Sequence, residues 1–100
     1  MNADTTSIAL LDRRLALHPQ VALRPEPFGA LAYHYGNRKL IFLKHPDVVR
    51  VVQALADHDT IADTLLACDI DPARWPSFER ALTALTESEM LHERRQDAPG

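Results

Sequence analysis

Residues 40–43 read Leu-Ile-Phe-Leu, an uninterrupted apolar run that strongly constrains how this chain can fold. A strand with one face in the core and the other in water alternates apolar and polar residues. Four apolar residues in a row therefore predict a strand that needs cover on both of its faces. A chain of 100 residues has room for only one modest core. The cover of the second face must come either from a helix of the same chain or from a partner.

The segment before this run predicts its partner in a sheet. Residues 30–35 have the composition of a strand, and Gly36-Asn37 fits a two-residue hairpin loop of type II′. Such a loop fixes the register of the hairpin. The predicted pairs are Tyr33 with Leu40, Leu31 with Phe42, Ala32 with Ile41 and Ala30 with Leu43.

The remaining signals complete an α+β pattern. Residues 20–24 predict a first strand, which Pro25 and Pro27 are expected to end. Three amphipathic helices are predicted over residues 45–57, over residues 60–68, and from Trp75 or Pro76 to Ser88. The second helix is expected to begin at a cap formed by Thr60 and to bury either Cys68 or Leu66. The third helix is expected to bury Ala81 together with Phe78, Leu82 and Leu85, and Met90 and Leu91 are expected to fold back onto the core. The expected fold is α+β and winged-helix-turn-helix-like, with a three-stranded antiparallel sheet packed on three helices and the strand at 38–44 on a free edge.

The ends of the chain differ in composition from its middle. Residues 1–14 predict a flexible N-terminal tail, residues 15–93 one folded domain, and residues 94–100 a flexible C-terminal tail. No segment approaches the roughly 20 consecutive apolar residues of a membrane span, and the N-terminus does not resemble a secretory signal. The single cysteine, Cys68, cannot form an internal disulfide, so we expect a cytoplasmic protein without membrane association.

The net charge of −3 is unevenly distributed. Through His45 there are six basic and three acidic residues, whereas five basic and eleven acidic residues follow. The predicted hairpin thus lies in the cationic half. Arg38, Lys39 and Lys44 flank the apolar run and are either ordinary solvated charges or an attraction for an anionic partner.

The sequence contains no pattern typical of a catalytic or metal site. Its three glycines form no phosphate-binding loop, and His45, His58 and Cys68 lack zinc-ligand spacing. We therefore expect no enzymatic activity and no cofactor. A DNA-binding regulator is an alternative for a winged-helix-like fold, but Glu87, Glu89 and Glu93 at the end of the third helix would repel phosphate, which argues against nucleic acid.

The apolar run itself suggests peptide binding. Either the third helix covers the strand completely, or a groove opens between the two along the free edge of the strand. An extended peptide could then pair with residues 38–44 and insert side chains beside Phe78 and Leu82. The guest of such an interaction domain is not defined by this pattern.

Two stretches resemble a known family. Residues 17–44, "LHPQVALRPEPFGALAYHYGNRKLIFLK", and residues 71–82, "DPARWPSFERAL", are similar to the mycofactocin-system peptide chaperones. These are small PqqD-like recognition elements for ribosomally made, post-translationally modified peptides. The resemblance implies that the leader of the mycofactocin precursor peptide binds as an added strand. It also implies presentation of that precursor to a radical-SAM maturase, which carries the iron–sulfur clusters and modifies the C-terminal Val-Tyr.

The resemblance also assigns candidate peptide-binding residues. They form an edge and a facing wall, and the sequence does not decide which wall residues face the groove and which face the core. It leaves open the oligomeric state, the maturase docking surface and the direction of the guest strand. The edge comprises Arg38, Lys39, Leu40, Ile41, Phe42, Leu43 and Lys44, and the wall comprises Trp75, Phe78, Leu82 and Leu85.

Overall fold

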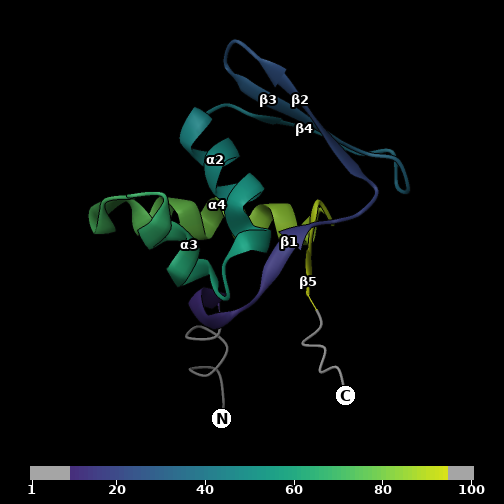
Figure 1. Ribbon diagram of the computed structural model, residues 1–100. Helices are drawn as coiled ribbons and strands as arrows, with labels where there is room; N and C mark the ends of the chain where they lie inside the picture. Colours follow the sequence, from purple (N-terminus) through teal and green to yellow (C-terminus); the bar gives the residue numbers. More distant parts are fainter. Residues whose placement is uncertain (1–9, 95–100) are drawn as a thin grey trace, which may run out of the picture.

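The computed structural model describes residues 10–94 and shows a sheet on one side of a group of helices (Figure 1). The sheet contains β2 (Val21–Glu26), β3 (Gly29–His34) and β4 (Leu40–Leu43) in the antiparallel order β2-β3-β4. These strands confirm the predicted α+β class and the three-stranded meander with its last strand on an edge.

Three helices and two 3-10 turns follow the sheet. Helix α2 (Pro46–Ala54) tightens into the turn η1 (Leu55–Asp57), α3 (Ile61–Ala67) follows, and the turn η2 (Pro72–Arg74) leads into α4 (Trp75–Glu87). All three predicted helices are confirmed. The predicted cap at Thr60 is confirmed as well, since its hydroxyl accepts a hydrogen bond from the Asp63 N–H at 3.1 Å.

The hairpin register agrees with the prediction at all four pairs, from Tyr33–Leu40 to Ala30–Leu43. One face of the hairpin enters the core, where Ala30 and Ala32 are almost completely buried together with Leu43. The opposite face includes Leu40 and Phe42, which are 51% and 55% exposed. The helices therefore cover only one face of β4.

The hairpin tip differs from the predicted type II′ turn. Arg38 takes the left-handed conformation (φ 65°), and the connection spans residues 35–39. The cause is His34, whose buried ring accepts hydrogen bonds at Nδ1 from the N–H groups of Gly36 and Asn37 at 3.0 and 3.1 Å. A ring inside the turn needs a wider loop. Glycine is required at 36 because a Cβ there would lie 2.8 Å from Cε1 of His34.

The predicted end of the first strand at Pro25 is wrong. β2 continues to Glu26, and Pro25 pairs with Ala30. The carbonyl of Gln20 accepts a hydrogen bond from the Tyr35 N–H at 2.8 Å, so Gln20 and Tyr35 form a hydrogen-bonded pair. Because hydrogen-bonded and non-bonded pairs alternate along the ladder, Pro25 and Ala30 form a non-bonded pair, and the backbone nitrogen of Pro25 points away from β3. A proline is tolerated there because the missing N–H lies on the outer side of an edge strand.

Two short strands were not predicted. β1 (Leu15–Leu17) and β5 (Leu91–Glu93) form a separate antiparallel pair, to the right of α3 in Figure 1. Met90 and Leu91 fold back into the core as expected, and both are buried. Three-residue strands carry too little alternation to be recognised in a sequence.

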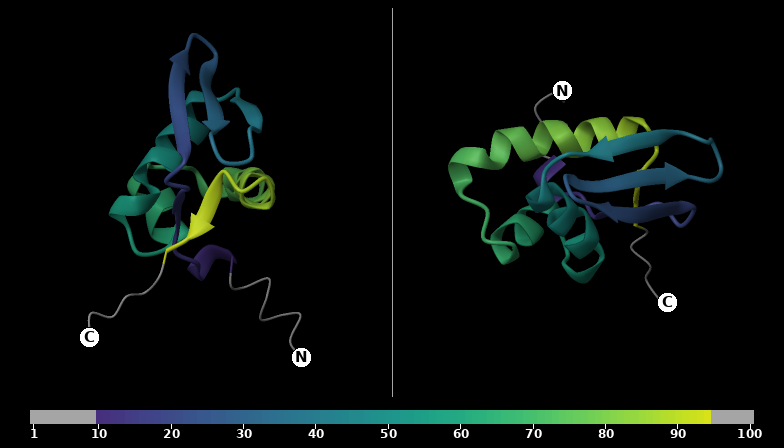
Figure 2. Two further views of the ribbon diagram at one scale, coloured as in Figure 1. Left: turned by 90° about the vertical axis from the view of Figure 1, so that its right-hand side faces the viewer. Right: turned by 90° about the horizontal axis from the view of Figure 1, so that it is seen from above.

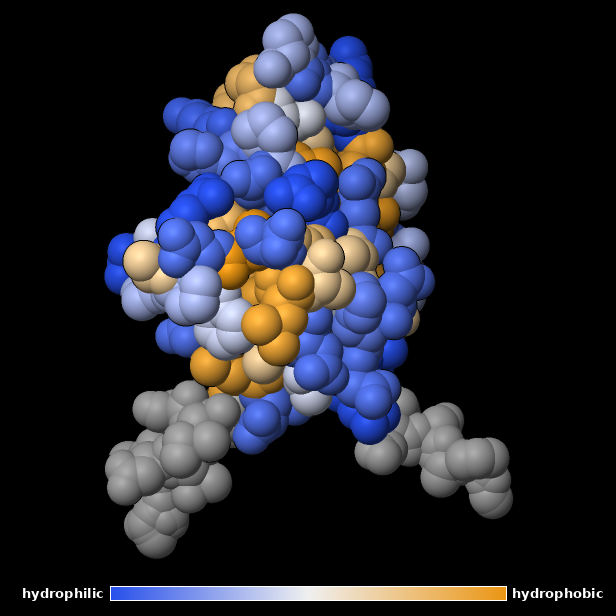
Figure 3. Space-filling model, turned by 60° about the vertical axis from the view of Figure 1, so that its left-hand side comes forward, coloured by the Kyte–Doolittle hydropathy of each residue, from blue (hydrophilic) through white to orange (hydrophobic). Residues whose placement is uncertain are grey.

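Most of the core consists of the predicted apolar stripes of the helices. In α3 the sequence left Leu66 and Cys68 as alternatives for a core position, and Cys68 is buried while Leu66 is 62% exposed. Figure 3 shows the side of the molecule that carries α3, where apolar atoms also reach the surface. Exposed apolar side chains therefore occur on both the sheet and the helical side.

The predicted tails lie mostly outside the described residues, namely residues 1–9 and 95–100. Leu10 and Leu11, which were predicted to belong to the N-terminal tail, pack against the core. Arg94, predicted to begin the C-terminal tail, donates its backbone N–H to the carbonyl of Arg14 at 2.7 Å.

Gly29 provides a test of the sheet. Its φ is +149°, and an added Cβ would lie 2.1 Å from the carbonyl oxygen of Leu43. We expect Gly29→Ala to lower the free energy of unfolding by at least about 2 kcal/mol, because a strained conformation and a backbone clash combine. Urea denaturation measures this. The control Ala22→Gly, at a regular strand position, should cost only about 0.5–1 kcal/mol, and equal losses would contradict the explanation.

Candidate functional site

The free edge of β4 carries unpaired backbone groups at two residues. The N–H of His34 donates to the carbonyl of Lys39 at 3.0 Å, which makes this the hydrogen-bonded pair nearest the tip. In an antiparallel ladder such pairs alternate with non-bonded pairs. Ile41 and Leu43 therefore bond to β3, while the N–H and C=O groups of Leu40 and Phe42 point outward.

The other edge of this sheet is much less available. On the outer side of β2, the Val21 N–H already donates to the carbonyl of His18 at 2.9 Å, and Pro25 has no N–H. Arg24 and Glu26 add charge to the strand and form an ion pair at 3.2 Å. Proline and charge are common protections of an edge strand, and β4 has neither between its ends.

An apolar groove lies between β4 and α4, which run side by side in the right-hand view of Figure 2. We call it the β4–α4 groove, and its hollow measures about 250 Å³. Alanines on α4 leave this space open because their side chains are too short to reach β4. The lining residues are Ile41, Phe42, Leu43, Lys44, His45, Val48, Ala81, Ala84 and Leu85.

The candidate wall residues occupy different places. Leu85 lines the β4–α4 groove, and Phe78 lines a second hollow that continues the wall past His45. Leu82 is fully buried in the core. Trp75 is half-buried against the core, and its Nε1 donates to the carbonyl of Ile70 at 3.0 Å.

Four residues of the groove were not among the candidates, namely His45, Val48, Ala81 and Ala84. Ala81 was expected in the core and is only half-buried, Ala84 is exposed, and Val48 extends the wall from α2. The spacing of two alanines three apart, next to Leu85, is the sequence signal that could have indicated a hollow at this side of the helix.

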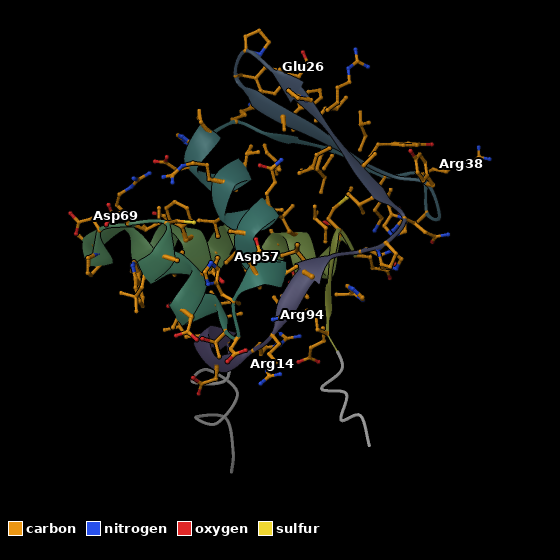
Figure 4. All side chains as sticks on the ribbon, viewed as in Figure 1. Arg14, Glu26, Arg38, Asp57, Asp69 and Arg94 are labelled. Atoms are coloured by element: carbon orange, nitrogen blue, oxygen red, sulfur yellow. The ribbon has the colours of Figure 1, made fainter. Side chains whose placement is uncertain are left out.

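The candidate cations lie at the two ends of β4. Arg38 extends from the hairpin tip, at the opposite end of the sheet from Glu26 (Figure 4). Lys39 precedes the strand and Lys44 follows it, and both are exposed. None of the three cations forms an ion pair within residues 10–94.

An ion-pair cluster fixes α4 against α2 next to the groove. The carboxylate of Asp47 accepts hydrogen bonds from Arg50 and from Arg74, each at 3.0 Å. These hydrogen bonds, that of Arg50 first, hold the pKa of Asp47 below its ordinary value. Arg74 also lies over the ring of Phe78, 5.2 Å from its centroid, which orients the start of α4.

At the other end of the groove, Asn37 connects the hairpin tip to the end of α4. Its side-chain amide donates long hydrogen bonds to the carbonyl of Ser88 at 3.5 Å and to Glu89 at 3.4 Å. This contact connects the hairpin to α4 at the tip end of β4, whereas Lys44 and His45 line the groove at the other end of the strand.

Among residues 10–94 no three His, Cys, Asp or Glu side chains gather closely enough to hold a metal ion. No helix in the same range is long and apolar enough to cross a membrane. Cys68 is buried, and burial raises the pKa of its thiol.

An open sheet edge beside an apolar groove defines a class of small α+β domain that can accept an extended peptide as an additional strand. The chain belongs to the Peptide chaperone MftB family, whose model matches residues 14–92. This range contains the whole three-stranded sheet and all three helices. Family membership supports a peptide-binding chaperone role.

The similar proteins are mycobacterial. The chain is 49% identical over 80 residues to a "Peptide chaperone MftB" of Mycobacterium tuberculosis (strain ATCC 25618 / H37Rv), which covers 80% of this chain and 73% of that protein. It is 51% identical over 75 residues to the protein so named in Mycolicibacterium smegmatis, covering 75% and 74%. Identity to that of Mycobacterium ulcerans (strain Agy99) is 48%, covering 80% and 73%. No solved structure matches the chain significantly.

The Asp47 cluster predicts a pH dependence. Because the pKa of Asp47 is lowered on folding, its contribution to stability is present above the ordinary value of 3.8 and is lost as the pH falls through the lowered pKa. We expect Asp47→Asn to reduce the melting temperature at pH 7, with the difference from wild type shrinking below pH 3.8. Thermal melts across this range test it, with the exposed Asp69→Asn as control. A constant difference would contradict the assignment.

Proposed function

We propose that this protein is a non-catalytic peptide chaperone that binds the leader of the mycofactocin precursor peptide by strand addition to β4. It then presents the precursor to the radical-SAM maturase that modifies the C-terminal Val-Tyr. Only the leader is held, so the C-terminal residues of the precursor stay accessible. The chaperone works in the cytoplasm and needs no cofactor, because the maturase supplies the reaction chemistry.

The observation that supports this function best is the open β4 edge next to an apolar groove. Leu40 and Phe42 offer N–H and C=O groups to a guest strand. Each hydrogen bond contributes about 0.5–1.5 kcal/mol net, and each inserted apolar side chain about 1.5–3 kcal/mol. A few of both are enough for micromolar affinity, about −8 kcal/mol, after the cost of ordering the peptide.

The charges around the groove favour a peptide with acidic residues. Arg38 and Lys39 lie at one end of β4 and Lys44 at the other, so a guest strand would meet a cation at each end. Such exposed charges mainly increase the association rate and restrict the register of the guest. They add little to affinity, since exposed ion pairs are weak.

The alternative of a DNA-binding regulator receives no comparable support. Helix α4 ends at Glu87, and Glu89 follows with φ 66° in the exposed turn after it. Arg38, Lys39 and Lys44 lie instead at the two ends of β4, next to an apolar groove that suits a peptide better than a phosphate backbone.

Filling the groove tests the proposed function. Ala81→Leu would extend a side chain into the hollow between α4 and β4, where the guest side chains are expected to bind. We expect at least a tenfold weaker affinity for a synthetic mycofactocin precursor peptide, measured by isothermal titration calorimetry. The matched control is Thr83→Leu, which lies two residues along the same helix and faces another side of it.

The control should bind as the wild type does. Both variants introduce a leucine, a strong helix former, on α4, so the free energy of unfolding should change little. An Ala81→Leu variant that folds and binds the precursor with wild-type affinity would contradict a guest in this groove.

A further inference from the structure

The outer face of the sheet becomes more apolar toward the free edge. On β2 this face carries Ala22 and the Arg24–Glu26 ion pair. On β3 it carries Leu31 and Tyr33, both half-buried, and on β4 it carries the more exposed Leu40 and Phe42. Phe28 lies next to Phe42 with ring centroids 5.8 Å apart.

This gradient identifies the kind of occupant. A docking surface for a second sheet or a helix would be centred on the face, with polar residues around it. Among the apolar side chains of the three strands, those of Leu40 and Phe42 on β4 are the most exposed, and they lie beside the groove; Tyr35, which is 60% exposed, lies beyond the end of β3 in the hairpin tip. An occupant that continues the sheet past β4 would cover them where they are most exposed.

The hydrogen-bond alternation places the side chains of such an occupant. Leu40 and Phe42 are the residues with outward N–H and C=O groups, so the guest residues that pair with them lie directly opposite. Directly opposite residues point to the same face of a sheet, with Cβ atoms roughly 4.5–5.5 Å apart. The side chains of these guest residues therefore lie on the outer face, and those between them enter the β4–α4 groove.

We propose that the guest is recognised on both faces of its strand, as a segment of consecutive apolar residues. One alternate set of side chains fills the groove, and the other covers Leu40 and Phe42 on the outer face. This inference rests on the proposed function and extends it. The groove alone would also accept a guest whose outward-facing side chains are polar, whereas the outer face requires apolar ones. The apolar run at 40–43 is thus matched by an apolar run in its ligand.

The double variant Leu40→Thr/Phe42→Thr tests this proposal. Threonine keeps a β-branched side chain suited to a strand, and both positions are exposed, so the hairpin should stay folded. We expect a loss of affinity for the synthetic mycofactocin precursor peptide of at least about tenfold, which removal of two partly covered apolar side chains would cause. The control Leu66→Gln removes a leucine of similar exposure, 62%, from α3 and should bind as wild type.

The outcomes separate this proposal from the function on which it rests. If the wild type binds, Ala81→Leu weakens binding and the double variant does not, the guest is in the groove and recognition on the outer face is wrong. If the wild type itself does not bind the peptide, both proposals fail. If the double variant binds normally but converts a dimer to a monomer in sedimentation velocity, a second copy covers the face, and the proposal is overturned.

Discussion

The structure depends on the way β4 divides its bonding between two neighbours. Ile41 and Leu43 direct their backbone groups to β3 and their side chains inward, so they hold the strand to the domain. Leu40 and Phe42 direct their backbone groups away from β3 and their side chains to the outer face of the sheet. Because the alternation of backbone bonds and that of side chains have the same period, one strand is fixed in the core and open to a partner at once.

Helix α4 makes the open edge useful. Leu82 and Leu85 anchor the helix in the core, and the Asp47 ion pairs with Arg50 and Arg74 fix its start. The short side chains of Ala81 and Ala84 leave the space between the helix and β4 unfilled. A larger residue at these positions would supply the missing cover from within the chain. Under the proposed function, the alanines leave that cover to a guest peptide.

Much of the fold could be predicted from the sequence, since its periodicity and turn signals are strong. The hairpin register was correct although the turn type was wrong: the register depends on the number of residues between Tyr33 and Leu40, whereas the turn conformation depends on the buried His34 ring. The prediction for the end of β2 was wrong because the effect of Pro25 depends on which side of the strand its nitrogen faces.

The site was harder to predict than the fold. The edge could be located from the apolar run alone, but the wall could not, because Phe78, Leu82 and Leu85 share one apolar stripe and only packing separates core from groove. Ala81 carries no chemical signal of binding. Its contribution under the proposed function is the space that it leaves, which depends on the position of β4 relative to α4.

Residue-resolved amide hydrogen exchange tests the central claim most directly, measured with and without a saturating mycofactocin precursor peptide. In the free protein, the Ile41 and Leu43 amides should exchange slowly and the Leu40 and Phe42 amides quickly. The account predicts that the peptide slows exchange selectively at Leu40 and Phe42. Unchanged exchange at these two amides with the peptide bound, or new protection along β2 instead, would contradict it.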